Sequence, residues 1–404
     1  MESSSRNPLR ILRVADLPNN RTSGASRALH STGDVLASQG HQVDFLFGED
    51  LPGGRSVKLR RFTVPLRLPR LIAGLARTGR RYDVVEMHEP LGAPYCLMLR
   101  RAKKKLPPLT LYSHGLEERG HAADLAYRRK KGLPVSLKSR YSPLSVTLQA
   151  AYGVRRANHV VCCNSEDVAH LRRAGVPASR LTCLRTGVDP EFVAAGAARE
   201  GNENANGDGA ASRIVFAGSW LPRKGILDVV PAVSQVMRRR PAVRFTVAGC
   251  GFGADTVLSA FDEGLRERIA VLPRITGNAD LIATYVRHAV FVLPSFFEGQ
   301  PAVMIEAAAL GLAPVTTNVC GMADFVEDGK NGLTVPVGDV AALAARLETL
   351  IDDPALARRL GAAARQKAVR EHTWAVSALT LEAAYRQAIC DAGIHTGNLV
   401  TADA

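Results

Sequence analysis

The chain has 404 residues, a length that predicts two domains. Hydrophobic residues make up 46% and charged residues 22%, values ordinary for a soluble globular protein. The net charge of +14 comes from one half, because residues 1–190 hold 32 Lys and Arg against 15 Asp and Glu, a net of +17, whereas the rest carries −3. No apolar run reaches the ~18 residues of a membrane span, and Met1 to Pro8 lack the apolar segment of a secretory signal, so we expect a cytoplasmic protein.

The first predicted elements form a βαβ unit. Residues 10–14 favour a strand, a polar turn at 18–24 follows, and a helical pattern runs to Gln39, where Gly40 stops it before a second strand at 43–47. Later strands are expected at 84–85, 109–112 and 160–163. This alternation predicts an α/β domain.

Residues 194–212 contain no large apolar side chain, which predicts a flexible linker. Strands and helices then resume at 213–217, 226–239, 244–248, 289–293, 302–310 and 314–317, and residues 339–392 have a helical pattern. We therefore expect two doubly wound, Rossmann-like domains, at 1–193 and 213–370. A helix and tail at 371–404 could pack back on the first domain.

The most specific motif lies between Pro294 and Ala307. A loop carrying Glu298 leads from a predicted strand into a helix that carries Glu306. Backbone N–H groups at a helix N-terminus bind phosphate well. The residues expected to offer them are Gly299, Gln300 and Ala302. The alternative is that the two carboxylates are simply solvated.

A second motif is the strand-to-helix turn from Phe216 to Gly225. It contains the adjacent cations Arg223 and Lys224, which would neutralise the charge that develops on a pyrophosphate leaving group. Arg can make two parallel hydrogen bonds to phosphate, whereas Lys acts as a point charge. The alternative is a basic surface turn.

Together these motifs resemble the retaining family-four glycosyltransferases of the GT-B architecture (glycosyl transferases group 1). The resemblance rests on Glu298 and Glu306, separated by seven residues within Pro-Ser-x-x-Glu-Gly-x-Pro followed by Glu-Ala. It implies two Rossmann-like domains facing a central cleft, the first binding the acceptor and the second the nucleotide sugar. It also implies that Glu298 hydrogen-bonds the transferred sugar and that Glu306 holds the ribose.

The donor turn matches this family with one departure. Ser219 follows Gly218 at a position where many members have Arg. Arg223 would take the role of that Arg, as in relatives that build lipopolysaccharide cores. Two further matches are Gly249, in a Gly-x-Gly turn, and Ile275, in the segment whose backbone reads the nucleobase.

Matches in the first half are looser. Ser23 and Gly24 lie where the family has a glycine pair facing the donor phosphate and the acceptor, and Asp16 is an acceptor-side candidate. His114 matches a histidine whose imidazole approaches the donor sugar, and a packed or solvated histidine is the alternative. His88 also matches a family position, but we expect it to be structural.

The expected reaction moves a sugar from a nucleoside diphosphate sugar to a hydroxyl of a glycolipid, polysaccharide or lipopolysaccharide precursor. Retention by two displacements would need a carboxylate nucleophile. The sequence singles out none, and the resemblance implies front-face transfer in which the leaving phosphate helps to deprotonate the acceptor. The chain has no Asp-x-Asp motif between strands, and its seven cysteines lack zinc-site spacing, so we expect no metal and no cofactor.

The positive charge concentrates at 58–140, where 20 basic residues face 6 acidic ones. Basic clusters at 103–105 and 127–131 interleave with apolar residues, which suits docking on anionic headgroups at ~1 kcal/mol per basic residue. We expect peripheral attachment to the inner face of the cytoplasmic membrane. The alternative is the solubility surface of an arginine-rich proteome, but that bias should have made the second half basic too.

Other classes fit less well. A nucleic-acid-binding protein would not place its paired glutamates and Arg-Lys-Gly turn in the half that is not basic, and aromatic residues, at 5%, are few for a stacking platform. A dinucleotide-dependent oxidoreductase should show Gly-x-Gly-x-x-Gly after the first strand, which residues 19–24 lack. A phosphorylase, a nucleotide-sugar epimerase or a catalytically dead scaffold of the same architecture stays open.

Overall fold

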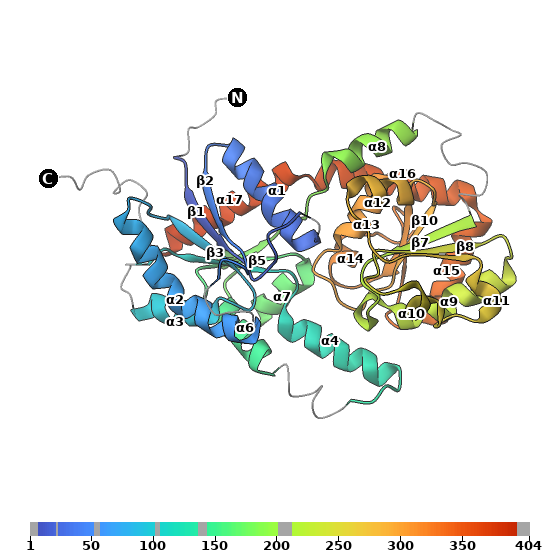
Figure 1. Cartoon of the computed structure of the whole chain (residues 1–404), viewed down its shortest axis with the longest axis horizontal. Coiled ribbons are helices and arrows are strands. Elements are labelled where there is room, and N and C mark those ends of the chain that lie inside the picture. Colours follow the sequence, from blue (N-terminus) through green and yellow to red (C-terminus); the bar gives the residue numbers. More distant parts are fainter. Residues whose placement is uncertain are drawn as a thin grey trace. The chain divides into compact units, whose positions relative to one another are not determined.

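The computed structural model describes residues 7–21, 23–51, 57–101, 106–135, 144–200 and 212–393. The chain forms two compact units, each built on a six-stranded sheet (Figure 1). The N-terminal unit comprises residues 1–121, 136–185 and 374–404, and the C-terminal unit comprises 122–135 and 186–373. Among the described residues, none of the helices has the length and apolarity needed to cross a membrane.

The sheet of the N-terminal unit is entirely parallel, in the order β2-β1-β3-β4-β5-β6. Its strands are β1 (Arg10–Val14), β2 (Gln42–Leu46), β3 (Val84–His88), β4 (Leu109–Ser113), β5 (His159–Cys162) and β6 (Leu181–Cys183). Separate apolar clusters pack on its two faces. Strands covered on both faces are rich in Val and Leu, which explains the valines of β3 and β5 and the leucines of β4.

Helices supply both of these clusters. They are α1 (Gly24–Ser38), α2 (Val57–Arg77), α3 (Ala93–Arg101), α6 (Leu144–Arg156), α7 (Ser165–Arg173) and α17 (Trp374–Asp391), with a 3-10 turn at Ala178–Arg180. Helix α17 comes from the end of the chain and packs beside α1, where Leu381 and Tyr385 join the cluster of Ile11 and Leu36. The last described helix therefore completes the core of the first unit.

The C-terminal unit has a second parallel sheet, in the order β9-β8-β7-β10-β11-β12. This is the strand order of the doubly wound dinucleotide-binding fold. Its strands are β7 (Arg213–Ala217), β8 (Arg244–Ala248), β9 (Ile269–Leu272), β10 (Val290–Leu293), β11 (Ala313–Thr317) and β12 (Leu333–Val335). The expectation of an α/β chain with two doubly wound domains is confirmed.

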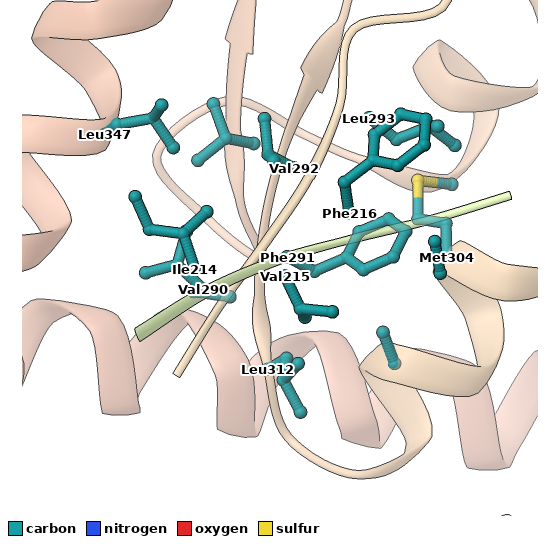
Figure 2. Packing of buried hydrophobic residues seen from close by; sticks show 14 of the residues in the cluster. Ile214, Val215, Phe216, Val290, Phe291, Val292, Leu293, Met304, Leu312 and Leu347 are labelled. Carbon is teal, nitrogen blue, oxygen red and sulfur yellow. The ribbon is translucent and has the colours of Figure 1, made fainter. Parts of the chain in front are cut away.

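The core of this unit lies on both faces of β7 and β10, whose side chains pack with Met304, Leu312 and Leu347 (Figure 2). Its helices are α8 (Pro190–Glu200), α9 (Ile226–Arg239), α10 (Ala254–Leu258), α11 (Glu263–Arg266), α12 (Asn278–Tyr285), α13 (Ala302–Ala309), α14 (Cys320–Phe325), α15 (Val340–Asp352) and α16 (Pro354–Glu371), with a 3-10 turn at Pro222–Lys224.

Helix α4 (Glu117–Lys130) begins in the N-terminal unit, but its residues from Ala122 onward belong to the C-terminal unit. The Tyr127 hydroxyl donates to the buried carboxylate of Asp228, 3.1 Å away, and its ring stacks on Phe296 with the centroids 4.5 Å apart. Lys131 forms an ion pair with the same Asp228. A segment far away in the sequence thus completes the C-terminal unit.

The structure differs from the expected domain boundaries in two places. Residues 194–200, placed in the linker, are the last turns of α8, and 201–211 lie outside the described residues. The alanines of this segment are the best helix formers, so the lack of large apolar side chains was not a sign of flexibility there. The boundary between the units falls after Arg185 rather than at 193.

Candidate functional site

In the C-terminal unit the strand order reverses between β7 and β10, because the chain moves from each of them toward opposite edges of the sheet. Ligands of doubly wound sheets bind outside the carboxyl ends of the strands at such a point. The segments that leave these two strands are 218–225 and 294–301. They contain the two motifs singled out in the sequence.

Three charged side chains from these segments meet. The Glu298 Oε1 lies 2.8 Å from Nζ of Lys224 and 2.7 Å from Nη1 of Arg223. Glu298 and Lys224 are largely buried, whereas about half of the Arg223 side chain is exposed. The predicted carboxylate and cations therefore lie together.

Glu298 is ionised in this cluster. Burial by itself would raise the pKa of its carboxyl group, but the charges and hydrogen bonds of Lys224 and Arg223 lower the pKa below its ordinary value. An ionised carboxylate only accepts hydrogen bonds. It can therefore accept them from the hydroxyl groups of a ligand.

Backbone contacts hold the two segments together. Phe296 donates its N–H to the carbonyl oxygen of Arg223, at 3.1 Å, and the Arg223 guanidinium donates to the carbonyl oxygen of Phe297, at 2.9 Å. Gly225 ends the 3-10 turn with φ at 77°, a left-handed conformation that favours glycine. This turn directs Lys224 toward Glu298.

Gly218 and Ser219 follow β7 directly. Gly218 has φ at 127°, and a Cβ at this position would lie 3.6 Å from Cε of Lys224. Its backbone thus runs next to the Lys224 side chain, where a bound phosphate could contact both. Ser219 is exposed in the same turn.

The loop after Glu298 is packed by its backbone. A Cβ on Gly321, in α14, would lie 1.9 Å from the carbonyl oxygen of Gly299, so only glycine allows this approach. The Gln300 side chain accepts a hydrogen bond from the backbone N–H of Thr186. The loop is therefore braced from two directions.

Helix α13 follows this loop. It begins at Ala302, with Pro301 at the N-cap. Glu306 lies on its buried side and is 3% exposed. A carboxylate at this depth must be hydrogen-bonded or bind a ligand group to offset its desolvation.

The turn after β8 lies next to the segment after β9. Gly249 has φ at 63°, and a Cβ there would be 3.7 Å from Cγ1 of Ile275. Gly249 also donates its N–H to the Leu272 carbonyl oxygen, at 2.8 Å. The structure thus brings Gly249 and Ile275 together, as neighbours at the carboxyl ends of two paired strands.

The N-terminal unit has its own switch point, between β1 and β3. Asp16 follows β1, and Ser23 caps α1 by accepting from the N–H of Ser26, at 3.3 Å. Gly24 is the first residue of that helix. All three candidates thus lie at the carboxyl edge of the sheet, where ligands of this fold bind.

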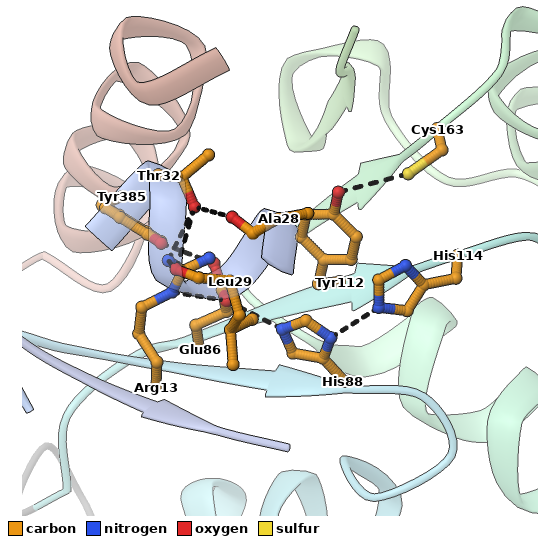
Figure 3. A network of polar contacts seen from close by, with 10 residues as sticks. All are labelled: Arg13, Ala28, Leu29, Thr32, Glu86, His88, Tyr112, His114, Cys163 and Tyr385. Carbon is orange, nitrogen blue, oxygen red and sulfur yellow. Dashed lines mark hydrogen bonds and ion pairs between the residues drawn. The ribbon is translucent and has the colours of Figure 1, made fainter. Parts of the chain in front are cut away.

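His114 lies at the same edge, directly after β4, and is exposed. Its Nε2 is 2.8 Å from Nδ1 of His88, whose own Nε2 is 3.0 Å from Oε1 of Glu86 (Figure 3). His88 is 3% exposed, and its ring stacks on Tyr112 with centroids 4.7 Å apart. We expected a functional role for His114 and a structural one for His88. The structure joins the two rings directly by a hydrogen bond.

Sequence reasoning did not find the buried ion pair beneath these histidines. Arg13 and Glu86 are neighbours in the register of β1 and β3, with Nε of Arg13 2.9 Å from Oε1 of Glu86. The signal that could have found them is a charged residue inside each of two strands that otherwise read as fully buried.

The basic cluster at 127–131 differs from its expected role as a free surface. Lys131 pairs with Asp228, Lys130 donates to the carbonyl oxygen of Val337, and Arg128 pairs with Asp124. The cluster at 103–105 lies outside the described residues. Much of the charge at 127–131 is therefore used within the C-terminal unit.

Two protein families match the chain. Residues 22–192 match the model of "Glycosyltransferase Family 4", and residues 211–353 match that of "Glycosyl transferases group 1". Together the two matches extend over most of the chain, one on each side of the expected linker.

Individual relatives agree with these matches. Over 366 residues the chain is 27% identical to a glycogen synthase of Mycobacterium tuberculosis, covering 87% of this chain and 81% of the relative. It is 26% identical to D-inositol 3-phosphate glycosyltransferase of Corynebacterium efficiens, covering 90% and 91%. The fold is similar to that of sucrose-phosphate synthase from Thermosynechococcus elongatus, with a TM-score of 0.73, 21% identity, and coverage of 95% and 99%.

Proposed function

The chain belongs to the family-four glycosyltransferases of the GT-B architecture, and from this premise we propose that it transfers a hexosyl group from a nucleoside diphosphate sugar with retention of anomeric configuration and without a metal ion. The observation that carries the proposal is the cluster of Glu298, Lys224 and Arg223 at the switch point of the C-terminal unit.

The two cations suit the leaving group. Cleavage of the anomeric C–O bond places negative charge on the departing diphosphate, and preorganised cations stabilise that charge in the transition state. Lys224 and Arg223, which pair with Glu298, would also contact the diphosphate. They supply the charge that a divalent metal supplies elsewhere, which supports metal-independent transfer.

The carboxylates suit the sugar and the ribose. Glu298 is ionised and would accept hydrogen bonds from hydroxyl groups of the transferred sugar, and Glu306 would hold those of the ribose. The backbone N–H groups expected to contact the diphosphate belong to Gly218, Ser219, Gly299, Gln300 and Ala302. Gly249 and Ile275 would border the nucleobase.

Within the proposed retaining reaction, the surroundings of Glu298 bear on the choice between two routes. A double displacement needs a carboxylate that is free to attack the anomeric carbon. Glu298 is held by two cations, which lowers its nucleophilicity. We therefore favour front-face transfer, in which the leaving phosphate accepts the proton of the acceptor hydroxyl.

Binding of the donor can be tested by thermal shift with UDP-, GDP- and ADP-sugars, since a ligand that binds the native state raises its stability. One donor class should raise the melting temperature. Transfer from that donor, with NMR of the product, then gives the anomeric configuration, and the rate should not change when EDTA is added. An inverted product or a rate abolished by EDTA and restored by a divalent metal would contradict the proposal.

The N-terminal unit supports a second proposal, that the protein attaches to the cytoplasmic leaflet and takes a lipid-linked or membrane glycan as acceptor. Helix α2 buries one side, through Val64, Leu68 and Ile72. Its other side exposes Leu66, at 55%, and Leu71, at 39%, and the neighbouring α3 exposes Leu97, at 49%. Apolar side chains exposed beside cations suit an interfacial helix.

Two cations lie near Leu66. Arg67 and Arg70 border, together with Leu66 and Met98, a hollow of about 540 Å³ between α2 and α3. Because the cluster at 127–131 is engaged in the C-terminal unit, α2 and α3 are the part of the basic region that supports membrane attachment best. Cations there would be attracted by anionic headgroups.

A further inference from the structure

A chain of three side chains connects the buried interior of the N-terminal unit to an exposed imidazole. Glu86 is fully buried, His88 is buried, and His114 is exposed at the carboxyl edge of the sheet. Figure 3 shows the three side chains in line, with Glu86 also facing Arg13 and Tyr385. The protonation state of Glu86 therefore determines which ring nitrogen of His114 carries a proton.

Glu86 is an acceptor only. Its Oε1 accepts from Nε of Arg13 at 2.9 Å, and its Oε2 accepts from the hydroxyl of Tyr385. Burial would raise the pKa of this carboxyl group, but the Arg13 charge and the hydrogen bonds from His88 and Tyr385 lower it to about 2. At neutral pH Glu86 has no proton to donate, so Nε2 of His88 must donate to it.

His88 in turn determines which ring nitrogen of His114 is protonated. Burial lowers the pKa of His88, which keeps the ring neutral with a single proton on Nε2. Its Nδ1 is then an acceptor, and the group 2.8 Å away, Nε2 of His114, must donate. The remaining nitrogen of His114, Nδ1, keeps its lone pair. Within the described residues, no hydrogen bond is formed by that nitrogen.

We propose that Glu86 and His88 are positioning residues that fix His114 as the Nε2–H tautomer, so that its Nδ1 presents a lone pair and accepts a hydrogen bond from a sugar hydroxyl. This inference rests on the proposed function only in its choice of ligand. Ring packing supports it, because Tyr112 lies 4.7 Å from both imidazole centroids and limits rotation of either ring.

The assignment has a consequence for the choice of substrate. An acceptor nitrogen attracts a hydroxyl group, which can donate, and repels a carboxylate or a carbonyl oxygen, which cannot. The position facing His114 would thus take a neutral hydroxylated sugar. A uronic acid with its carboxylate at that position would be disfavoured at neutral pH.

The tautomers can be read directly by long-range ¹H–¹⁵N NMR of the full chain labelled with ¹⁵N-histidine, because protonated and unprotonated ring nitrogens differ widely in chemical shift. Signals are assigned by loss in His88→Phe and His114→Phe. We expect Nε2–H and bare Nδ1 for both rings, and the same result in the control Tyr385→Phe, which leaves Oε1 of Glu86 in place. An Nδ1–H tautomer or a mixture at His114 in the wild type overturns the inference.

A kinetic cycle tests whether His88 acts through His114. Losing one hydrogen bond at a positioned imidazole corresponds to about tenfold in kcat/KM, so His88→Phe should lower the transfer rate by about that factor. The same substitution should have no further effect in the His114→Phe background. The inference is overturned if His88→Phe lowers kcat/KM tenfold in the His114→Phe background as well. The NMR result does not depend on turnover, so a chain without transferase activity would contradict the proposed function alone.

Discussion

The α-carbon of Gly225 packs directly against the carbonyl group of Pro294: a Cβ at position 225 would stand 2.2 Å from that oxygen. This contact joins the turn after β7 to the end of β10. It therefore adds to the backbone contacts that bring Lys224 and Glu298 within reach of each other.

Gly225→Ala should destabilise the C-terminal unit by more than about 2 kcal/mol, because the methyl group meets backbone in addition to the strain of a left-handed φ. Gly311→Ala is the matched control, since Gly311 has φ at 79° and nothing within 4 Å of its added Cβ. It should cost only about 1 kcal/mol. Urea denaturation measures both, and equal losses would show that the contact with Pro294 is not close.

Lys224→Ala should lower kcat by about 10²–10³-fold with a smaller change in donor KM, because the cation acts mainly on charge that develops in the transition state. Arg238→Ala, which removes an exposed cation at the other end of α9, is the control and should be silent. Steady-state kinetics with the donor found by thermal shift gives the two constants. Wild-type kcat in Lys224→Ala would remove this residue from the proposed site.

Glu306→Ala should weaken donor binding by about 10–100-fold, the range for hydrogen bonds to a charged group. Isothermal titration of the nucleoside diphosphate measures it, and the free nucleoside diphosphate suffices because the expected contact is to the ribose. Unchanged affinity, in a variant that melts as the wild type does, would remove Glu306 from the proposed donor site.

Leu66→Asp should reduce binding to anionic vesicles several-fold, because it removes an inserted apolar group and adds repulsion from the headgroups. Leu379→Asp is the matched control, since Leu379 on α17 in the same unit has the same exposure of 55%. Flotation with phosphatidylglycerol-containing and neutral vesicles at low salt reads out both variants. Equal recovery on the two vesicle types by the wild type would end the membrane proposal.

The ion pair of Glu86 predicts a pH dependence of stability. The folded-state pKa of about 2 lies below the ordinary value of 4.5, so Glu86 stabilises the fold above pH 4.5, and this contribution is lost as the pH falls toward 2. At pH 7 it is on the order of 3 kcal/mol. The stability gap between the wild type and Glu86→Gln should therefore shrink by roughly half from pH 7 to pH 3. A gap that is constant with pH would contradict the ionised state.

The sequence predicted the parts of the fold that depend on local pattern. Val290–Leu293 is a short, wholly apolar strand bounded by polar turns, and such a run in an alternating chain indicates a buried parallel strand. The proximity of Arg223 and Glu298 was predictable as well, because both residues lie in loops that follow strands of one doubly wound sheet.

Contacts that depend on the register of distant segments were not predictable in this way. Arg13 and Glu86 are 73 residues apart, and each alone interrupts the apolar pattern of its strand. Their burial is possible only because β1 and β3 are paired with these two positions adjacent. The contact of Tyr127 with Asp228 likewise joins positions 101 residues apart, and nothing local in either segment indicates it.

Both units are interleaved along the chain, which limits how the protein can be divided. A cut in the segment 201–211 would separate Asp228, 1% exposed, from Tyr127 and Lys131, leaving a buried charge without its partners. The same cut would remove Tyr385 from Glu86. The two halves of the sequence are thus not exchangeable modules, and a chimaera with a relative must transfer residues 122–135 and α17 along with the unit that each completes.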